Sequence, residues 1–538
     1  MSQGRYRVVI IGLDGATWRV LRPWREEMPY LHSLQQAGAY GALLSTLPPI
    51  TAPAWASFQT GVLPNKHGIY SFQQIDRAND QWTLRLVDAS FMRVRPFWHY
   101  LPQGQRVGIV NLPMSYPPAP VPGFLVTGFP TPSRRASFTF PPELQRELLD
   151  AVPDYDVPTP PKAPGFDHQR AEEYIARLIQ AVQACCQAAL YLMRRYSWDL
   201  FIVQFQETDF LQHELWHYLD SQHPCFSPQG AGLAKRFFRS LDTQIAQIHQ
   251  ELSPYDTLWI ISDHGFQAMR AAFYPNVWLQ EHGWLIPDAL TQSAQRWAHR
   301  IRSLGLGAWL HSPLAERARR WLRAREAHRS AAYAVAEHVG CFLLYLLTDE
   351  ALARQDELTD ALLHVKDPVT GEKIVRAVLP AREAFGEELA PGAPNLLVCL
   401  HEGYAALPNI KSPQLIEPWA PERNFQVGIH DPEGVFIACG PQIIPGQEGF
   451  RARLIDIAPT VLALLGVPIP THMDGRVLTE VCRPPSPPSP LPSEGEGSKG
   501  VRGLGVGDES ERREGPGERH PDASASEIRQ RLKDLGYL

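Results

Sequence analysis

Short, fully apolar segments alternate with longer stretches of helical periodicity along most of the chain. The apolar segments occupy residues 7–15, 106–113, 198–205, 256–265 and 394–400. Apolar runs of this length, without polar alternation, are typical of strands that are buried on both faces. Helical stretches at 168–196 and 232–252 lie between them. The alternation predicts an α/β fold, in which helices cover both faces of a mostly parallel sheet.

Polar side chains follow several of the predicted strands directly. These side chains belong to Asp14, Asn111, Asp209, Asp263 and His264. In open α/β sheets, ligand sites form at the carboxyl ends of the strands. The sequence therefore predicts a site at this edge of the sheet, built from carboxylates and imidazoles.

Two stretches interrupt the alternation. Residues 114–165 are proline-rich and irregular, and we expect them to fold over the body as a loop excursion. Residues 285–385 contain helical segments and are expected to form an inserted cap. An arginine-dense run from Arg296 to Arg329 lies within this cap, and such a run is more typical of a solvated helical face than of a ligand site.

The carboxyl-terminal part of the chain differs in composition from the rest. Residues 483–525 are rich in proline, glycine, serine and glutamate, and this composition predicts a disordered linker because it cannot build a core. Residues 526–538 are expected to form a short amphipathic helix. The main domain would therefore span residues 1–482.

Composition and charge narrow the class of protein. The 538 residues carry a formal net charge of −6, which implies no general attraction to nucleic acid. The chain shows neither a signal peptide nor an apolar stretch of about 18 residues, so no membrane span is expected. The seven cysteines form no C-x-x-C pair, which argues for reduced thiols and predicts a cytoplasmic protein.

One segment resembles the helix motif of zinc proteases. Within QETDFLQHELWHYLDSQH at 206–223, the residues from His213 to His217 fit H-E-x-x-H, and His223 stands where an extended motif has its third ligand. The extended motif needs glycine three residues after the second histidine, where this chain has Asp220. A protease in which Glu214 is the general base would also leave the polar residues at the other strand ends without a role.

A candidate nucleophile lies between two prolines. Thr51, with Pro49 and Pro53 on either side, is at the predicted start of a helix, where backbone N–H groups favour an anion. A plain N-cap threonine is a common alternative. Two further patterns are weaker indications of a metal site. They are the adjacent residues Asp263 and His264, which are both of a metal-ligand type, and the loop histidine His430.

Taken together, these motifs resemble one family. Thr51, Pro53, Thr60-Gly61, Pro64 and His67-Gly68-Ile69 are spaced as in the nucleophile segment of the type I phosphodiesterase/nucleotide pyrophosphatase family, in the alkaline phosphatase superfamily. Further matches follow the family order: GLDGATW at 12–18, NLPMSYPP at 111–118, TDFLQH at 208–213, SDHGF at 262–266, GIHDPEGVFIACGP at 428–441 and DIAPTVLALLGVPIPTHMDGRVL at 456–478. The resemblance spans about residues 1–480 and the RLKDLGYL end. It implies an alkaline-phosphatase-like three-layer sandwich with an inserted cap.

The resemblance also implies a site with two divalent metal ions, usually zinc, with manganese as the alternative. One ion would be held by Asp14, Thr51, Asp263 and His264. The other would be held by Asp209, His213 and His430. Thr51 would be the nucleophile and would form a covalent phosphothreonine intermediate. The expected activity is hydrolysis of a small phosphodiester or pyrophosphate, including nucleotides, and His217 and His223 would not be metal ligands.

The sequence departs from the family pattern in one informative place. Nucleotide pyrophosphatases have an asparagine 21 residues after the nucleophile, where this chain has Phe72. Asn111 is a candidate replacement as a substrate-binding donor. Sulfatases of the superfamily need a cysteine or serine in place of Thr51, so a sulfatase is not expected. A phosphomonoesterase or phosphomutase with the same metal core, and a nucleotide-binding protein without activity, remain alternatives. The residues that would set specificity lie in 114–165 and 285–385.

Overall fold

The computed structural model describes residues 6–483 apart from residues 79–80, 287–329, 409–411, 413 and 422–425, together with residues 527 and 529. The predicted linker beyond residue 483, most of the predicted carboxyl-terminal helix and the arginine-dense run of the predicted cap lie outside these residues. The predictions for those segments therefore stay predictions.

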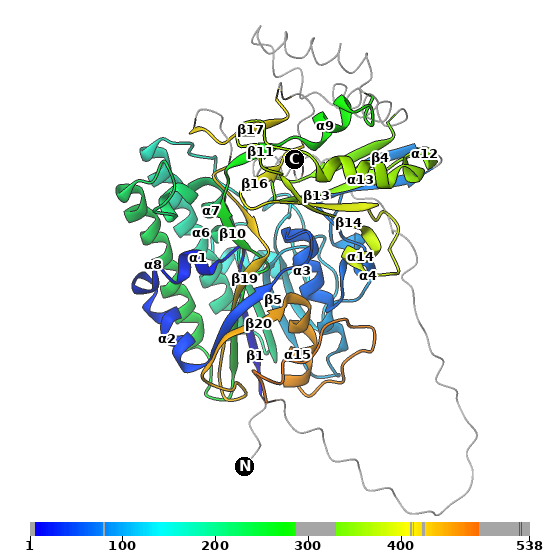
Figure 1. The fold of residues 1–538 in the computed structure, drawn as a ribbon. Helices are drawn as coiled ribbons and strands as arrows, with labels where there is room; N and C mark the ends of the chain where they lie inside the picture. Colours follow the sequence, from blue (N-terminus) through cyan, green and yellow to red (C-terminus); the bar gives the residue numbers. More distant parts are fainter. Residues whose placement is uncertain are drawn as a thin grey trace, which may run out of the picture.

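A nine-stranded sheet forms the centre of the fold (Figure 1). Its strands, from one edge to the other, are β20 (Gln447–Arg453), β2 (Ala39–Leu44), β19 (Glu433–Cys439), β9 (Thr257–Ile261), β1 (Val8–Leu13), β8 (Leu200–Phe205), β5 (Val107–Leu112), β6 (Gly123–Thr127) and β7 (Thr139–Phe140). The run from β9 to β6 is parallel throughout. Strand β19 is antiparallel to both of its neighbours. The predicted mostly parallel central sheet is confirmed.

Alternate side chains of β1 enter two different cores. Val9 and Ile11 belong to a core shared with α6 (His168–Arg195) and α8 (Pro228–Gln250). Val8 and Ile10 belong to a second core. That core is shared with α3 (Thr51–Thr60) and α15 (Ile457–Leu464), which cover the opposite face (Figure 1). A strand buried on both faces needs apolar residues at every position, as the sequence has them, and the result is the expected three-layer sandwich.

A second, smaller sheet takes three strands from the segment predicted as a cap and one strand from residues beyond it. It is antiparallel and contains β12 (Ala332–Ala336), β13 (Cys341–Leu346), β15 (Leu396–Leu400) and β14 (Val375–Pro380). The apolar segment predicted at 394–400 is β15, so its expected place in the central sheet is wrong. Strand β15 lies between β13 and β14 and is buried along its whole length, which makes its sequence look like that of a central strand.

The segment 114–165 also differs from the expectation of a loop excursion. It contributes β6 and β7 to the edge of the central sheet and contains the short helix α5 (Leu144–Ala151). Prolines surround these strands and hide their pattern, yet the edge of a sheet is where neighbouring prolines are tolerated.

Smaller elements complete the described chain. They are α1 (Trp18–Leu21), α2 (Pro29–Ala37), α4 (Pro64–His67), α7 (Glu207–Leu219), α9 (Pro275–Glu281), α12 (Asp349–Ala353), α13 (Gln355–Leu363), α14 (Ala381–Phe385), β3 (Gln73–Ala78), β4 (Gln81–Leu86), β10 (Gly265–Ala268), β11 (Ala271–Phe273), β16 (Tyr404–Ala406), β17 (Ile416–Pro418) and β18 (Gly428–Asp431).

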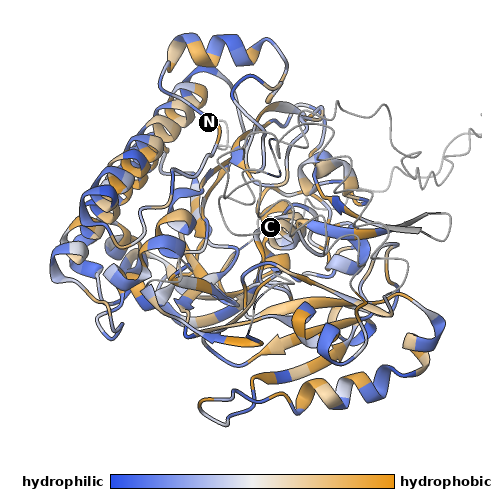
Figure 2. Cartoon of the chain, turned by 90° about the horizontal axis from the view of Figure 1, so that it is seen from above, coloured by the Kyte–Doolittle hydropathy of each residue, from blue (hydrophilic) through white to orange (hydrophobic). Residues whose placement is uncertain are grey.

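Among the described residues, α6 alone is long and apolar enough to cross a membrane by length and composition. Half of its most apolar window is buried inside the protein, where the helix packs against α7 and α8. Hydrophobic and hydrophilic residues are interleaved along the long helices (Figure 2). Partial burial of this kind is what a core helix of the sandwich requires.

Candidate active site

Three adjacent parallel strands bring four of the predicted site residues together. Asp14 follows β1, Asp263 and His264 follow β9, and Asp209 lies in the first turn of α7, directly after β8. Because β9, β1 and β8 are neighbours, their carboxyl ends meet at one edge. All four side chains are fully buried.

Thr51 is the first residue of α3, and its hydroxyl faces this edge. Thr51 Oγ1 lies 3.4 Å from Asp14 Oδ1 and 3.3 Å from His264 Nε2. The other oxygen of Asp14 accepts hydrogen bonds from Trp55 Nε1 and from Gln204 Nε2, each at 2.8 Å. These two donors fix the carboxylate so that Oδ1 points to the threonine.

Gly12 makes room for this arrangement. A Cβ atom at Gly12 would lie 2.6 Å from the Trp55 ring, so only glycine lets α3 pack this closely on the end of β1. Sequence reasoning missed both Trp55 and Gln204. A signal for Gln204 was present, because a glutamine inside an otherwise apolar buried strand needs a polar partner.

His430 reaches the cluster from a separate two-stranded sheet. It lies on β18, which pairs antiparallel with β10, so that Phe266 stands opposite His430. His430 Nε2 is 2.9 Å from His213 Nε2 and 3.3 Å from Asp209 Oδ1. His213 Nε2 is 3.4 Å from the same Asp209 oxygen.

Backbone carbonyl groups fix the two imidazoles. His430 Nδ1 lies 2.8 Å from the carbonyl oxygen of Pro49, and His213 Nδ1 lies 3.0 Å from that of Gly428. When Nδ1 donates to a carbonyl, the Nε2 atom of a neutral ring carries a lone pair. The two Nε2 atoms therefore need either a proton shared between them or a bound cation that accepts both lone pairs.

The carboxylates also indicate that the cluster binds a cation. Among the described residues, both oxygens of Asp209 and Oδ2 of Asp263 are buried and make no hydrogen bond of ordinary geometry. Leaving a buried charge without donors costs several kcal/mol, whereas a bound cation removes that cost. The donor set of carboxylate oxygens and imidazole nitrogens suits zinc or manganese. The residues therefore fit the predicted metal ions chemically.

The ligand atoms form two overlapping groups in which all atoms lie within 4.8 Å of one another. One group contains Asp14, Asp263 and His264, and the other contains Asp209, His264 and His430. The family resemblance implies His213, and not His264, as the third member of the second group. His264 lies between the groups because its ring stacks on that of His430, with 3.6 Å between the ring centroids.

Burial shifts the protonation equilibria of the cluster. Burial, together with repulsion from Asp263 and Asp209, raises the pKa of Asp14 well above its ordinary value. Burial and the neighbouring His430 lower the pKa of His264. Burial opposes ionisation of Asp209 as well, but His213 and His430 hold its pKa well below the ordinary value. Three carboxylates this close require positive charge nearby if all are to ionise.

Asn111 is at the predicted strand end, but its side chain is held elsewhere. Its Nδ2 lies 3.1 Å from Cys185 Sγ, and its Oδ1 accepts a hydrogen bond from the Tyr155 hydroxyl. Its backbone has a φ of 61°, and the register of β5 against β6 shifts beside it. A left-handed residue at a strand irregularity changes the direction of its side chain. Substrate binding by Asn111 stays a prediction, and its polar atoms already have partners.

The protease-like motif does not form a metal site of its own. Helix α7 has a kink at Leu215, where φ is −127° and ψ is 25°, between the two histidines of the motif. His217 lies among the rings of Phe166, Tyr218 and His223. His213 instead faces Asp209 and His430, so the two histidines do not converge.

Comparisons with known proteins bear on the family and the fold of the chain. Residues 8–433 match the family described as type I phosphodiesterase/nucleotide pyrophosphatase. No curated protein sequence matches the chain. Among solved structures, human ectonucleotide pyrophosphatase/phosphodiesterase 5 is 14% identical with a TM-score of 0.51, and the match covers 87% of this chain and 97% of that one.

Phosphonoacetate hydrolase from Sinorhizobium meliloti is similar as well. It is 16% identical with a TM-score of 0.51, and the match covers 84% of this chain and 94% of the hydrolase. At such identities, structural likeness shows a shared fold, while the family match extends over most of the chain. The chain belongs to the type I phosphodiesterase/nucleotide pyrophosphatase family and is a phosphoester hydrolase.

Proposed function

We propose that the protein is a metal-dependent hydrolase of a small phosphodiester or pyrophosphate and that Thr51 is its nucleophile. The observation that carries the proposal is the buried Thr51 hydroxyl at the start of α3, within 3.4 Å of both Asp14 Oδ1 and His264 Nε2. A murine relative of the same fold supports it, because its threonine-to-alanine variant is described as inactive and was obtained in complex with AMP.

Asp14, Asp263 and His264, with Thr51, would hold one divalent ion, and Asp209, His213 and His430 would hold the other. Divalent ions at such sites stabilise negative charge on a nucleophilic oxygen and on phosphoryl oxygens. Hydrogen bonds to the carbonyl groups of Gly428 and Pro49 keep His213 and His430, respectively, in position.

In the proposed reaction, phosphorus undergoes two successive substitutions. The Thr51 oxygen, after loss of its proton, attacks phosphorus, and the leaving group departs with the electrons of its P–O bond. Water then attacks the phosphothreonine, so that the bond between phosphorus and Thr51 breaks and the threonine is regenerated. The amino-terminal end of α3 favours the anionic phosphoryl group throughout, because the helix dipole is positive there.

Activity on matched substrates tests the proposal. The full chain is assayed with bis-p-nitrophenyl phosphate, p-nitrophenyl phosphate, a dinucleotide pyrophosphate and phosphonoacetate, each with zinc or manganese. Greater turnover of the diester or pyrophosphate than of the monoester is expected, and it should be lost on chelation. The Thr51→Ala protein is the control for contaminating phosphatases. A preference for the monoester would favour a phosphomonoesterase with the same core, and cleavage of phosphonoacetate alone would contradict the proposal.

A further inference from the structure

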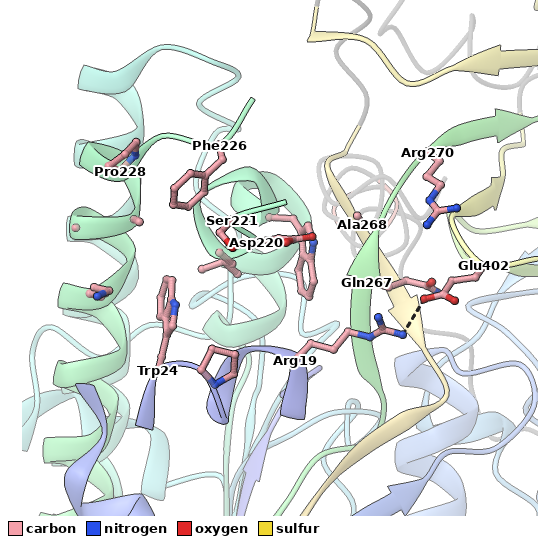
Figure 3. Close-up of a pocket in the computed structure, with 16 residues that line it drawn as sticks. Arg19, Trp24, Asp220, Ser221, Phe226, Pro228, Gln267, Ala268, Arg270 and Glu402 are labelled. Carbon is pink, nitrogen blue, oxygen red and sulfur yellow. Dashed lines mark hydrogen bonds and ion pairs between the residues drawn. The ribbon is translucent and has the colours of Figure 1, made fainter. Parts of the chain in front are cut away.

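Two features of the described chain lie outside the proposed set of metal ligands. One is a cavity of about 680 Å³ between α1, the α7–α8 connection and β10 (Figure 3). Arg19 in this cavity pairs with Glu402 and Asp431, and Asp220 lines it as well, so it offers no surplus charge to a ligand. The other feature is the turn at residues 337–340, which connects β12 to β13 in the smaller sheet.

Glu337 fixes this turn to the segment that follows the nucleophile helix α3. Its buried carboxylate accepts hydrogen bonds from the hydroxyl group of Ser71 and from the backbone N–H groups of the next two residues. The same segment is held to α3 by His67, whose Nε2 lies 2.9 Å from the Ser57 hydroxyl oxygen. Because three donors satisfy this carboxylate, Glu337 holds the turn against the part of the chain that carries Thr51.

The backbone of the turn is bonded on its other side to strands that continue from the metal cluster. The N–H group of His338 donates to the carbonyl oxygen of Ala406 at 3.0 Å. Ala406 pairs with Phe273 of β11, and β11 follows β10, which begins directly after His264. His338 therefore lies between two segments that both lead to the site, one from Thr51 and the other from His264.

The His338 side chain is placed as a group that meets a ligand. Its backbone has a φ of 58°, a conformation that is strained for residues other than glycine and is found most often at functional sites. The side chain is half-buried, and its ring makes no hydrogen bond with the described residues. Burial, together with repulsion from His213, lowers the pKa of His338 to about 3. The ring is therefore neutral at pH 7 and has one N–H group to donate.

From this arrangement we propose that His338 is a substrate-binding residue, whose ring N–H group donates a hydrogen bond to a phosphoryl oxygen of a substrate at the metal cluster. The inference rests on the proposed function, because it needs a phosphoryl group at that cluster. The sequence offers two other places for such a donor. The ring of Phe72 is buried against Phe129, and the polar atoms of Asn111 already have partners.

Inorganic phosphate is a suitable probe, because it presents phosphoryl oxygens and contains no ester bond. Titration calorimetry of the full chain, loaded with zinc or manganese, measures its affinity. His338→Gly removes the ring, and glycine adopts a positive φ without strain, so the thermal midpoint should not fall. We expect phosphate affinity to fall about 10- to 100-fold, as for loss of a hydrogen bond to a charged group, with metal content unchanged. The kcat/KM for bis-p-nitrophenyl phosphate should fall by a similar factor.

Matched variants separate the ring from the backbone. His338→Asn keeps a donor in a residue that tolerates positive φ, and it should retain part of the phosphate affinity. His364→Gly changes an exposed histidine at the end of α13 and should leave both affinity and kcat/KM unchanged.

If His338→Gly binds phosphate as the wild type does, or loses phosphate only together with bound metal, His338 does not contact the substrate. The proposed function fails separately, if the wild type binds phosphate but shows no turnover that depends on Thr51. In that case the phosphate affinities still decide the role of His338.

Discussion

The two halves of α7 carry the same kind of side chain in opposite surroundings. His213, before the kink, has one ring nitrogen fixed by the Gly428 carbonyl and the other directed at Asp209. His217, after the kink, is equally buried, but its Nδ1 has no hydrogen-bond partner among the described residues and its neighbours are aromatic rings. Burial of a histidine alone therefore does not indicate a ligand. The indication comes from a carbonyl on one nitrogen and a carboxylate on the other.

The electrostatic consequences of the two environments are opposite. Burial disfavours the charged form of both rings. At His213 the nearby Asp209 outweighs that effect and raises the pKa above its ordinary value. At His217 burial, together with the neighbouring His223, lowers the pKa to about 4. Only the first environment is prepared for positive charge.

The largest expected contrast is between two alanine substitutions. His213→Ala should lose one of two bound metal equivalents and lower kcat/KM by at least about 100-fold, because ligands and their supports are costly to remove. His217→Ala should keep both metal equivalents and most of the activity. Metal analysis and steady-state kinetics on the two purified variants measure this contrast. Equal metal loss in both proteins would mean that His217 is also a metal ligand.

A smaller contrast concerns stability and pH. The folded-state pKa of His217 is below the unfolded value of about 6.5, so the unfolded chain binds the proton more readily, and stability falls as the pH drops below about 6.5 toward 4. His217→Phe removes this group. Relative to the wild type, the variant should gain about 2 kcal/mol of unfolding free energy between pH 7.5 and pH 5. Urea unfolding at both pH values measures the gain, and an unchanged difference would show that His217 is not held neutral.

The smallest effect is expected at Glu214, between the two histidines. A zinc protease would need this carboxylate as general base. As a residue outside the proposed site, Glu214 should tolerate replacement by glutamine with a change in kcat/KM below about threefold. Loss of activity in Glu214→Gln with full activity in Thr51→Ala would favour the protease interpretation.

The kink explains why sequence alone could not separate the two halves. Residues four apart lie on one face of a regular helix, so His213 and His217 were expected to be neighbours in the protease interpretation. The non-helical backbone at Leu215 changes that relation, and the motif contains no proline or glycine that would indicate a kink. The places of Asp14, Asp209 and Asp263 after predicted strands, in contrast, predict that they share one edge of the sheet, because sites form at the carboxyl ends of parallel strands.

Other differences come from context that a local pattern does not contain. The run that forms β15 is apolar at every position because it is an interior strand, but the pattern does not say of which sheet. Strand β6 was missed because prolines surround it. Asn111 was placed correctly at a strand end, whereas the direction of its side chain depends on a single left-handed φ.

The central claim is that Thr51 forms a covalent intermediate with phosphorus. Rapid mixing of the metal-loaded enzyme with substrate, acid quenching and peptide mass spectrometry tests it most directly. A phosphoryl or nucleotidyl adduct is predicted on the peptide that contains Thr51, with a similar adduct on Thr51→Ser and none on Thr51→Ala. If no adduct forms and Thr51→Ala turns over substrate at nearly the wild-type rate, water attacks phosphorus directly and the claim is contradicted.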